Sequence, residues 1–313
     1  MNRICNILVF VDPTVAAHPC VDKAAALASK FNARLELYVC DTRVTRDMRL
    51  MRAREQNPNA ALTVNLKPML EELARPLRQR GIDVCTECEY ASVLHEGLID
   101  RAKRTIADLI VKETHHHSLA QRTFLTNTDW ELIRGSPIPL LLTKERPWHS
   151  LPRILAALDP AVVNDKPESL DQEILDYASQ LSQRLGAELH AAHAYVPIAI
   201  AATADAVMAP MATTLDPSVF EIEEKQQRTR LRAVTESYRI PPERLHLELG
   251  VASEVLPSLA HTINADILVM GAVSRRGLAK IFIGSTAERA LERLPCDVLV
   301  VKPPDFAAAL PIA

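Results

Sequence analysis

The sequence repeats itself at a spacing of about 150 residues, and this repeat constrains the fold more than any other feature. A chain of 313 residues is long enough for about two domains, each with its own core. We therefore expect two copies of one domain, residues 1–147 and 152–313, joined by a proline-containing seam. Four pairs of blocks recur in the same order: RICNILVFVDP with PRILAALDP, ALASKFNARLELYVCD with QLSQRLGAELHAAHAY, RTIADLIVKET with HTINADILVMGAV, and DWELIRGSPIPLLLTKERP with RALERLPCDVLVVKPP.

Apolar strands alternate with helical stretches in each half. This alternation predicts an α/β fold with a doubly wound, mostly parallel, five-stranded sheet per half. Ser92 is the expected N-cap of the third helix of the first half. In that half the spacing predicts strands at 4–11, 34–40, 82–90, 108–113 and 138–143, and helices at 21–31, 60–80 and 92–104.

Glycines are rare in this chain but gather near its end. Only eight occur, and Gly271, Gly277 and Gly284 fall within one short stretch. It begins after the apolar strand 267–270, where a glycine would permit a positive φ or the close approach of a ligand. It ends with Gly284-Ser285-Thr286 directly before a helical run, where free N–H groups favour an anion such as phosphate. This order is typical of an α/β nucleotide site, and a loop that only packs is the alternative.

The same stretch resembles the universal stress proteins, which carry G-x2-G-x9-G-[ST] between their last two strands. Here Gly271 begins the motif and Gly284-Ser285 ends it, but Ser274 stands in place of the second glycine. Because the repeat covers essentially the whole chain, the protein is similar to a tandem universal stress protein. The resemblance implies five-stranded α/β domains that pair within one chain as a pseudo-dimer.

The resemblance also implies an adenine nucleotide, ATP in particular and with Mg²⁺ as a candidate companion, in the second half. Asp159 ends a strand at the carboxyl edge, where open α/β sheets bind ligands, although a turn residue before Pro160 is an equal alternative. Ser274 weakens the motif if the family needs a glycine there. The nucleotide-binding residues carried over are Asp159, Ala194 through its backbone, Met270, Gly271, Ser274, Gly284, Ser285 and Thr286.

The first half lacks this motif. Glu113-Thr-His-His116 replaces the first glycine pair, and a segment ending in Asp129 replaces Gly-Ser. A carboxylate near a helix N-terminus stabilises the helix but occupies or repels a phosphate position, so we expect no nucleotide there. His115 and His116 are weak zinc candidates, since adjacent residues rarely converge on one ion, and a solvated loop is the favoured reading.

Two further features have structural explanations that compete with functional ones. Cys85 and Cys88 have metal-site spacing but lie in a predicted strand, so they should face opposite sides and stay reduced. The apolar segment 196–211 is expected to pack on the sheet, with a subunit contact or a lid over an apolar ligand as alternatives.

Composition and motifs narrow the function. A net charge of −3 gives no electrostatic case for nucleic acid or a membrane surface, and no apolar run approaches twenty residues, so we expect a cytoplasmic protein. No triad, Walker lysine or HExxH motif is found, which disfavours an enzyme. The leading hypothesis is a non-enzymatic stress-response protein that binds ATP. The alternatives are a scaffold or apolar-ligand module acting through the pseudo-dimer surface, with or without homodimerisation, and a weak ATPase.

Overall fold

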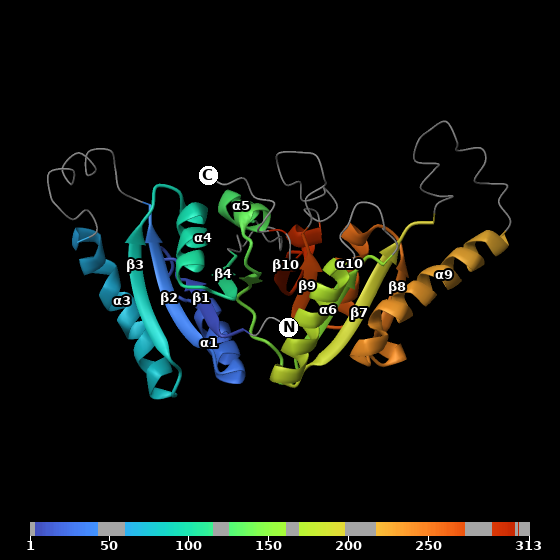
Figure 1. The fold of residues 1–313 in the computed structure, drawn as a ribbon, viewed down its shortest axis with the longest axis horizontal. Coiled ribbons are helices and arrows are strands. Elements are labelled where there is room, and N and C mark those ends of the chain that lie inside the picture. The colour runs from blue at the N-terminus through green and yellow to red at the C-terminus, as the bar shows by residue number, and fades with distance from the viewer. Residues whose placement is uncertain are drawn as a thin grey trace. The chain divides into compact units, whose positions relative to one another are not determined.

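The computed structural model describes residues 4–42, 60–114, 125–160, 169–197, 217–272, 290–303 and 306. The chain divides into two compact units, Met1–Pro147 and Trp148–Ala313. In each unit, strands and helices alternate along the chain (Figure 1). The pairing of the two units as a pseudo-dimer stays a prediction.

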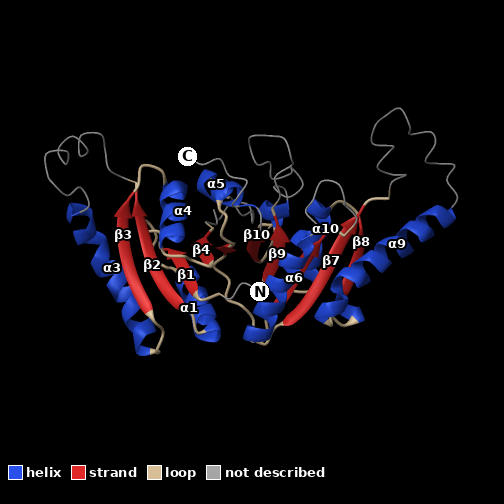
Figure 2. Ribbon diagram, in the orientation of Figure 1, coloured by secondary structure: helices blue, strands red, loops and turns tan. Residues whose placement is uncertain are grey.

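The first unit contains a parallel sheet with the strand order β3-β2-β1-β4-β5. Its strands are interleaved with helices (Figure 2), so that each crossover returns the chain to the same end of the sheet. The elements are β1 (Asn6–Phe10), α1 (Pro19–Phe31), β2 (Arg34–Asp41), α3 (Ala60–Gln79), β3 (Val84–Tyr90), α4 (Leu94–Arg104), β4 (Leu109–Glu113), α5 (Asn127–Gly135) and β5 (Leu140–Thr143).

The second unit has the same topology, with the order β8-β7-β6-β9-β10 and parallel pairing throughout. Two short 3-10 turns, Glu236–Tyr238 and Pro242–Arg244, precede β8. The elements are β6 (Arg153–Leu158), α6 (Ser169–Leu185), β7 (Glu188–Tyr195), α9 (Pro217–Thr235), β8 (Leu245–Leu249), α10 (Ala252–Thr262), β9 (Ile267–Gly271) and β10 (Asp297–Val301). The predicted α/β fold class is therefore confirmed.

Helices cover both faces of the first unit's sheet. On one face, Arg101 of α4 contacts Glu36 of β2, and Asp129 of α5 contacts Lys112 of β4. On the opposite face, Glu71 of α3 accepts a hydrogen bond from the hydroxyl group of Thr86 in β3. Strands covered on both sides are expected to be apolar almost throughout, and β4 and β5 are buried along nearly their whole length.

At equivalent turns of the two units, a residue just after the helix has a positive φ in both, so the repeat extends to the backbone conformation of single residues. Asn32 (φ 53°) follows α1 where Gly186 (φ 66°) follows α6. Ile106 (φ 51°) follows α4 where Asn264 (φ 50°) follows α10. Glycine and asparagine adopt this conformation readily, whereas a β-branched isoleucine adopts it only with backbone strain. Ile106 is therefore the strained member of its pair.

Two local predictions can be tested against the backbone. Cys85 and Cys88 do lie on opposite faces of β3, because Cys85 pairs in register with Glu36 and Cys88 with Val39. The N-cap prediction for Ser92 is wrong: α4 begins at Leu94, its N-cap is the extended residue Val93, and no described side chain caps it. Ser92 lies one position too early to take that role.

Several predicted features lie outside the described residues, namely His115, His116 and all of the apolar segment except Val196 and Pro197. Among the helices that the structure describes, none is long and apolar enough to span a membrane.

Candidate functional site in the second unit

The strand order of the second unit reverses direction at β6. From β6 the chain proceeds through β7 to β8 on one side, and returns to β9 and β10 on the other. Such a reversal leaves a crevice at the carboxyl ends of the central strands, where open α/β sheets bind their ligands. Of the predicted site residues, Asp159, Ala194, Met270 and Gly271 are described, and all four lie at this edge.

Asp159 follows the last residue of β6 and remains accessible. Its side chain is 49% exposed, and its backbone N–H donates to Asp171 Oδ1 of α6 at 3.2 Å. Asp171 is itself buried, so the backbone of Asp159 is fixed while its carboxylate faces outward. A fixed, half-exposed carboxylate at this edge can accept hydrogen bonds from the hydroxyl or amine groups of a ligand.

The backbone of Ala194 lies just beyond the part of β7 that pairs with β6, while it still pairs with Glu248 of β8. The ladder between β6 and β7 ends with Leu158 opposite His193. Tyr195 directs its carbonyl towards β8, where it accepts from Gly250 N, so the neighbouring Ala194 is oriented towards β6. The next strand partner there would be Pro160, which has no N–H to donate. The ladder therefore offers the Ala194 carbonyl no N–H from Pro160, and a ligand donor could take that place.

Met270 and Gly271, at the end of β9, have packing roles as well. Met270 is buried, with 8% of its surface exposed. Gly271 does not have a positive φ; instead, a Cβ at this position would lie 2.5 Å from Cδ2 of Leu170 in α6. From the sequence alone, the close approach of a ligand explains this glycine. The structure gives a second reason, which is the close packing of the Leu170 side chain.

The remaining predicted residues, Ser274, Gly284, Ser285 and Thr286, lie outside the described part of the chain. The described residues that follow them, Ala290 and Leu291, are buried as a helix packed on the sheet requires.

Sequence reasoning missed His193 on β7. This side chain is only 2% exposed, with Nδ1 at 3.2 Å from the carbonyl oxygen of Leu158 and 3.9 Å from Oδ1 of Asp159. Its Nε2 is buried and has no hydrogen-bond partner among the residues that the structure describes. The signal in the sequence is a histidine near the carboxyl end of a buried strand, where the first half has Val39. His193 therefore adds a second polar group beside Asp159.

The equivalent edge of the first unit is filled by an internal ion pair. Lys112 Nζ lies 2.8 Å from Asp129 Oδ1, and their side chains are 4% and 0% exposed. Asp129 Oδ2 also accepts from the N–H of Thr126 at 2.7 Å and from its hydroxyl at 2.8 Å, while Thr126 Oγ1 accepts from Asp129 N. This reciprocal capping box begins α5. The first unit thus places its own carboxylate at the helix N-terminus.

Among the described residues, no three or more His, Cys, Asp or Glu side chains are grouped to hold a metal ion. What the second-unit edge does offer is an exposed carboxylate, a buried imidazole and backbone groups beyond the end of a ladder. These groups can form hydrogen bonds with a polar ligand at the edge where doubly wound sheets bind their ligands.

The model of the Universal stress protein family matches residues 4–144 and again residues 152–302. Universal stress protein E of Salmonella typhi is 26% identical over 307 residues, which cover 96% of this chain and 95% of that protein. A crystal structure from Pseudomonas aeruginosa UCBPP-PA14, described as a putative universal stress protein, has a TM-score of 0.76 and 29% identity, with 97% of this chain and 95% of that chain covered. A protein of Pseudomonas aeruginosa PAO1 described as functionally unknown aligns over the same shares, with a TM-score of 0.75 and 28% identity.

The doubled α/β domain, with the same strand order in each unit, thus defines a class of tandem, doubly wound α/β proteins. The chain belongs to the universal stress protein family, whose members are stress-response proteins. Two segments, TNTDWELIRGSP in the first half and LDPSVF in the second, point to a particular similarity with universal stress protein E. The relative from Salmonella typhi, aligned over nearly the whole chain, confirms that similarity.

Proposed function

We propose that this protein is a cytoplasmic, non-enzymatic member of the family that binds an adenine nucleotide, ATP in particular, in its second unit. The observation that carries the proposal is the convergence of Asp159, the backbone of Ala194 and the end of β9 at the switch point of one sheet. The chain between β9 and β10 contains Gly284-Ser285-Thr286, whose sequence is suited to holding phosphate.

Each part of this edge suits a different part of a nucleotide. The carboxylate of Asp159 and the carbonyl of Ala194 are acceptors for ligand hydroxyl and amine groups. Gly284-Ser285-Thr286 supplies N–H and hydroxyl donors for phosphate oxygens, with Mg²⁺ as a companion ion if ATP brings it. Because the sequence contains no catalytic triad, Walker lysine or HExxH motif, we propose binding without dedicated catalysis.

A universal stress protein has been solved in complex with cAMP, so one member of the family binds an adenine nucleotide. Its TM-score of 0.34 and its 20% identity to this chain are too low to transfer that ligand. The proposal therefore rests on the residues of the second unit.

Calorimetric titration with ATP tests the proposal with two substitutions that are expected to change the affinity for ATP in opposite directions. Gly284→Val places a side chain where phosphate would approach and should abolish binding. Ser274→Gly restores the second glycine of the family motif and should tighten binding. Stability is measured in parallel, because a valine at a position with positive φ would add about 1–3 kcal/mol of strain. The nucleotide hypothesis fails if neither the wild type nor Ser274→Gly shows heat at millimolar ATP.

One observation favours a second candidate function, a binding module without nucleotide. Large apolar side chains are exposed along α9 and around the end of β8, by between 41% and 62%: Val219, Ile222, Leu249 and Val251. Exposed apolar residues of this kind can bind a protein or an apolar ligand. Mass spectrometry of small molecules released from the denatured protein distinguishes the two: an adenine nucleotide supports the first, and a lipid-like molecule supports the second.

A further inference from the structure

A cavity of about 290 Å³ opens at the amino ends of β1, β2 and β3, beside the last turn of α4. It lies at the opposite edge of the sheet from the one that binds ligands in doubly wound folds. Among the described residues that line it are three arginines, Arg34, Arg101 and Arg104, against a single carboxylate, Glu36. The thiol of Cys85 forms part of the wall. The lining thus carries three guanidinium groups and one carboxylate, and further carboxylates, among them Glu89 and Asp100, lie directly beside it.

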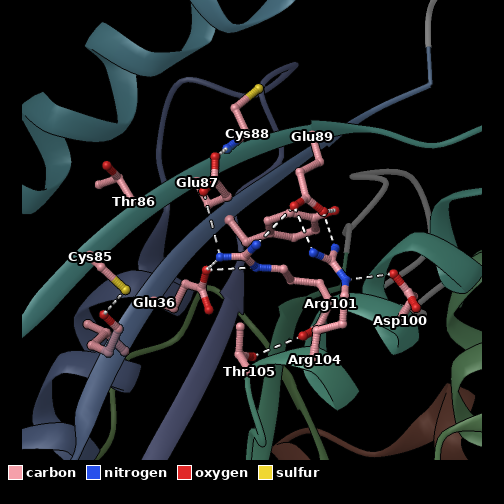
Figure 3. Close-up of polar contacts among 12 residues, drawn as sticks. Glu36, Cys85, Thr86, Glu87, Cys88, Glu89, Asp100, Arg101, Arg104 and Thr105 are labelled. Atoms are coloured by element: carbon pink, nitrogen blue, oxygen red, sulfur yellow. Dashed lines mark hydrogen bonds and ion pairs between the residues drawn. The ribbon is translucent and has the colours of Figure 1, made fainter. Parts of the chain in front are cut away.

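Carboxylates in and beside the cavity hold two of these arginines in place: Glu36 belongs to the lining, whereas Glu89 and Asp100 do not. Arg101 lies between Glu36 and Glu89, with Nε 2.9 Å from Glu36 Oε1 and Nη1 2.9 Å from Glu89 Oε1 (Figure 3). Arg104 donates to the same Glu89, at 3.2 Å from Nη1, and to Asp100 at 2.9 Å from Nε. The side chains of this network all come from β2, β3 and α4, so packing of α4 on the sheet fixes the guanidinium positions.

Each guanidinium keeps donors for a further acceptor. A guanidinium has five N–H groups, and the hydrogen bonds of Arg101 and of Arg104 use one on each of the three nitrogens. Arg34 is exposed at the start of β2 and adds a third guanidinium at the cavity. Three basic residues in the last turn of α4, Lys103 among them, offset the negative end of its helix dipole.

The second unit does not share this arrangement. The repeat aligns Arg34 with Glu188 and Glu36 with His190, so a carboxylate stands where the first unit has a guanidinium. Glu188 accepts from Arg153 Nε at 3.2 Å and from Arg244 Nη2 at 2.8 Å, and His190 stacks on His246. In place of Arg101 and Arg104 the second unit has Leu259 and Thr262. The arginine lining thus belongs to the first unit.

We propose that this cavity is a binding site for a small anion that carries a phosphate or carboxylate group. Arginine forks bind both groups in a bidentate manner, and preorganised arginines lose less side-chain entropy on binding. A volume of about 290 Å³ is at the lower end of ligand pockets, which fits a sugar phosphate or a dicarboxylate rather than a whole nucleotide. The site is independent of the nucleotide proposed for the second unit.

Cys85 provides a local readout of occupancy. The rate at which N-ethylmaleimide alkylates Cys85 in the intact protein is measured by peptide mass spectrometry. Cys5 serves as the internal reference, because it is exposed and is not part of the cavity wall. The probes are inorganic phosphate and succinate, each compared with sodium chloride at the same ionic strength. At about ten times its Kd, a bound probe should slow alkylation of Cys85 about ten-fold and leave Cys5 unchanged.

The variants Arg34→Gln and Arg104→Gln should lose this protection, whereas Arg80→Gln, an exposed arginine of the same unit outside the cavity, should keep it. Arg34→Gln leaves the network of Arg101 and Arg104 intact, so its folding is not at risk. Protection by phosphate alone or by succinate alone identifies the preferred group. The proposal is overturned if neither probe protects Cys85, if chloride protects equally, or if Arg34→Gln and Arg104→Gln are protected like the wild type. Asp159→Asn should retain the protection even if ATP binding is absent.

Discussion

The two units share a topology and differ in where they place charge. At the carboxyl edge the first unit buries the pair Lys112 and Asp129, where the repeat aligns Met270 and Ala287 in the second unit. At the amino edge the first unit has arginines around a cavity, where the second has paired histidines beside Glu188. Two copies of one backbone can therefore carry different charged residues at equivalent positions, provided that each buried charge is paired with an opposite charge or hydrogen-bonded.

The ion pair of the first unit should be the most sensitive to mutation. Asp129→Ala would leave the ammonium of the buried Lys112 without its carboxylate and would also remove the capping box. We expect a loss of about 3–5 kcal/mol in the free energy of unfolding, because the remaining charge stays buried. Urea denaturation monitored by circular dichroism measures it.

In the matched control, Lys112 and Asp129 are both replaced by the residues found at the equivalent positions of the second unit, methionine and alanine. The double variant Lys112→Met with Asp129→Ala removes both charges and should recover most of the lost stability, since replacing a buried pair by apolar residues is often neutral. If the double variant is as unstable as Asp129→Ala alone, the pair is not the cause of the destabilisation. The two units would then differ for another reason.

The histidine pair of the second unit predicts a pH dependence of stability. Burial, followed by the charge of His246 and the nearby Arg244, lowers the pKa of His190 from 6.5 to about 4. The unfolded chain therefore binds the proton more tightly, and stability falls as pH decreases from about 6.5 to about 4. The pKa of His246 is lowered as well, mainly by burial, which acts in the same direction.

His190→Gln should flatten this dependence, because glutamine keeps a polar group beside His246 but does not titrate. The effect is at most about 3 kcal/mol across the window, since one pKa unit corresponds to about 1.4 kcal/mol. Free energies of unfolding at closely spaced pH values between 7 and 4 give the measurement. A slope that is unchanged in the variant would assign the dependence to other groups.

The smallest predicted effect concerns the turns after α4 and α10. Ile106 is 75% exposed with φ 51°, whereas the equivalent Asn264 has φ 50°. Ile106→Asn should raise the free energy of unfolding by about 1 kcal/mol, and the reciprocal Asn264→Ile should lower it by a similar amount. Thermal unfolding of the two variants checks both signs. If Ile106→Asn destabilises, the isoleucine has a contact that offsets its backbone strain.

The sequence predicted the fold well because the repeat and the strand periodicity are local patterns. The strands and helices of the first half lie close to their expected bounds, and the opposite faces of Cys85 and Cys88 followed from the period of a strand. Ser92 failed as a cap because helix starts shift by one or two residues without changing the pattern.

The sites were predicted less completely, because their residues meet only through the tertiary fold. Lys112 and Asp129 are separated by sixteen residues in the sequence, and nothing in the motif indicates that their side chains touch. The residues that line the cavity come from several strands and a helix, so no single stretch of the sequence predicts it. The role of Leu170 beside Gly271 was likewise hidden, since a glycine that permits close packing looks the same in sequence as one that admits a ligand.

The central claim is that nucleotide binding belongs to the second unit alone. Isothermal titration of the intact protein with ATP and Mg²⁺ tests it by stoichiometry, with the equivalent variants Asp12→Asn and Asp159→Asn as a matched pair. We predict one site per chain, weakened at least about ten-fold by Asp159→Asn and unchanged by Asp12→Asn. Two sites per chain, or a site that Asp12→Asn weakens and Asp159→Asn does not, would contradict the account.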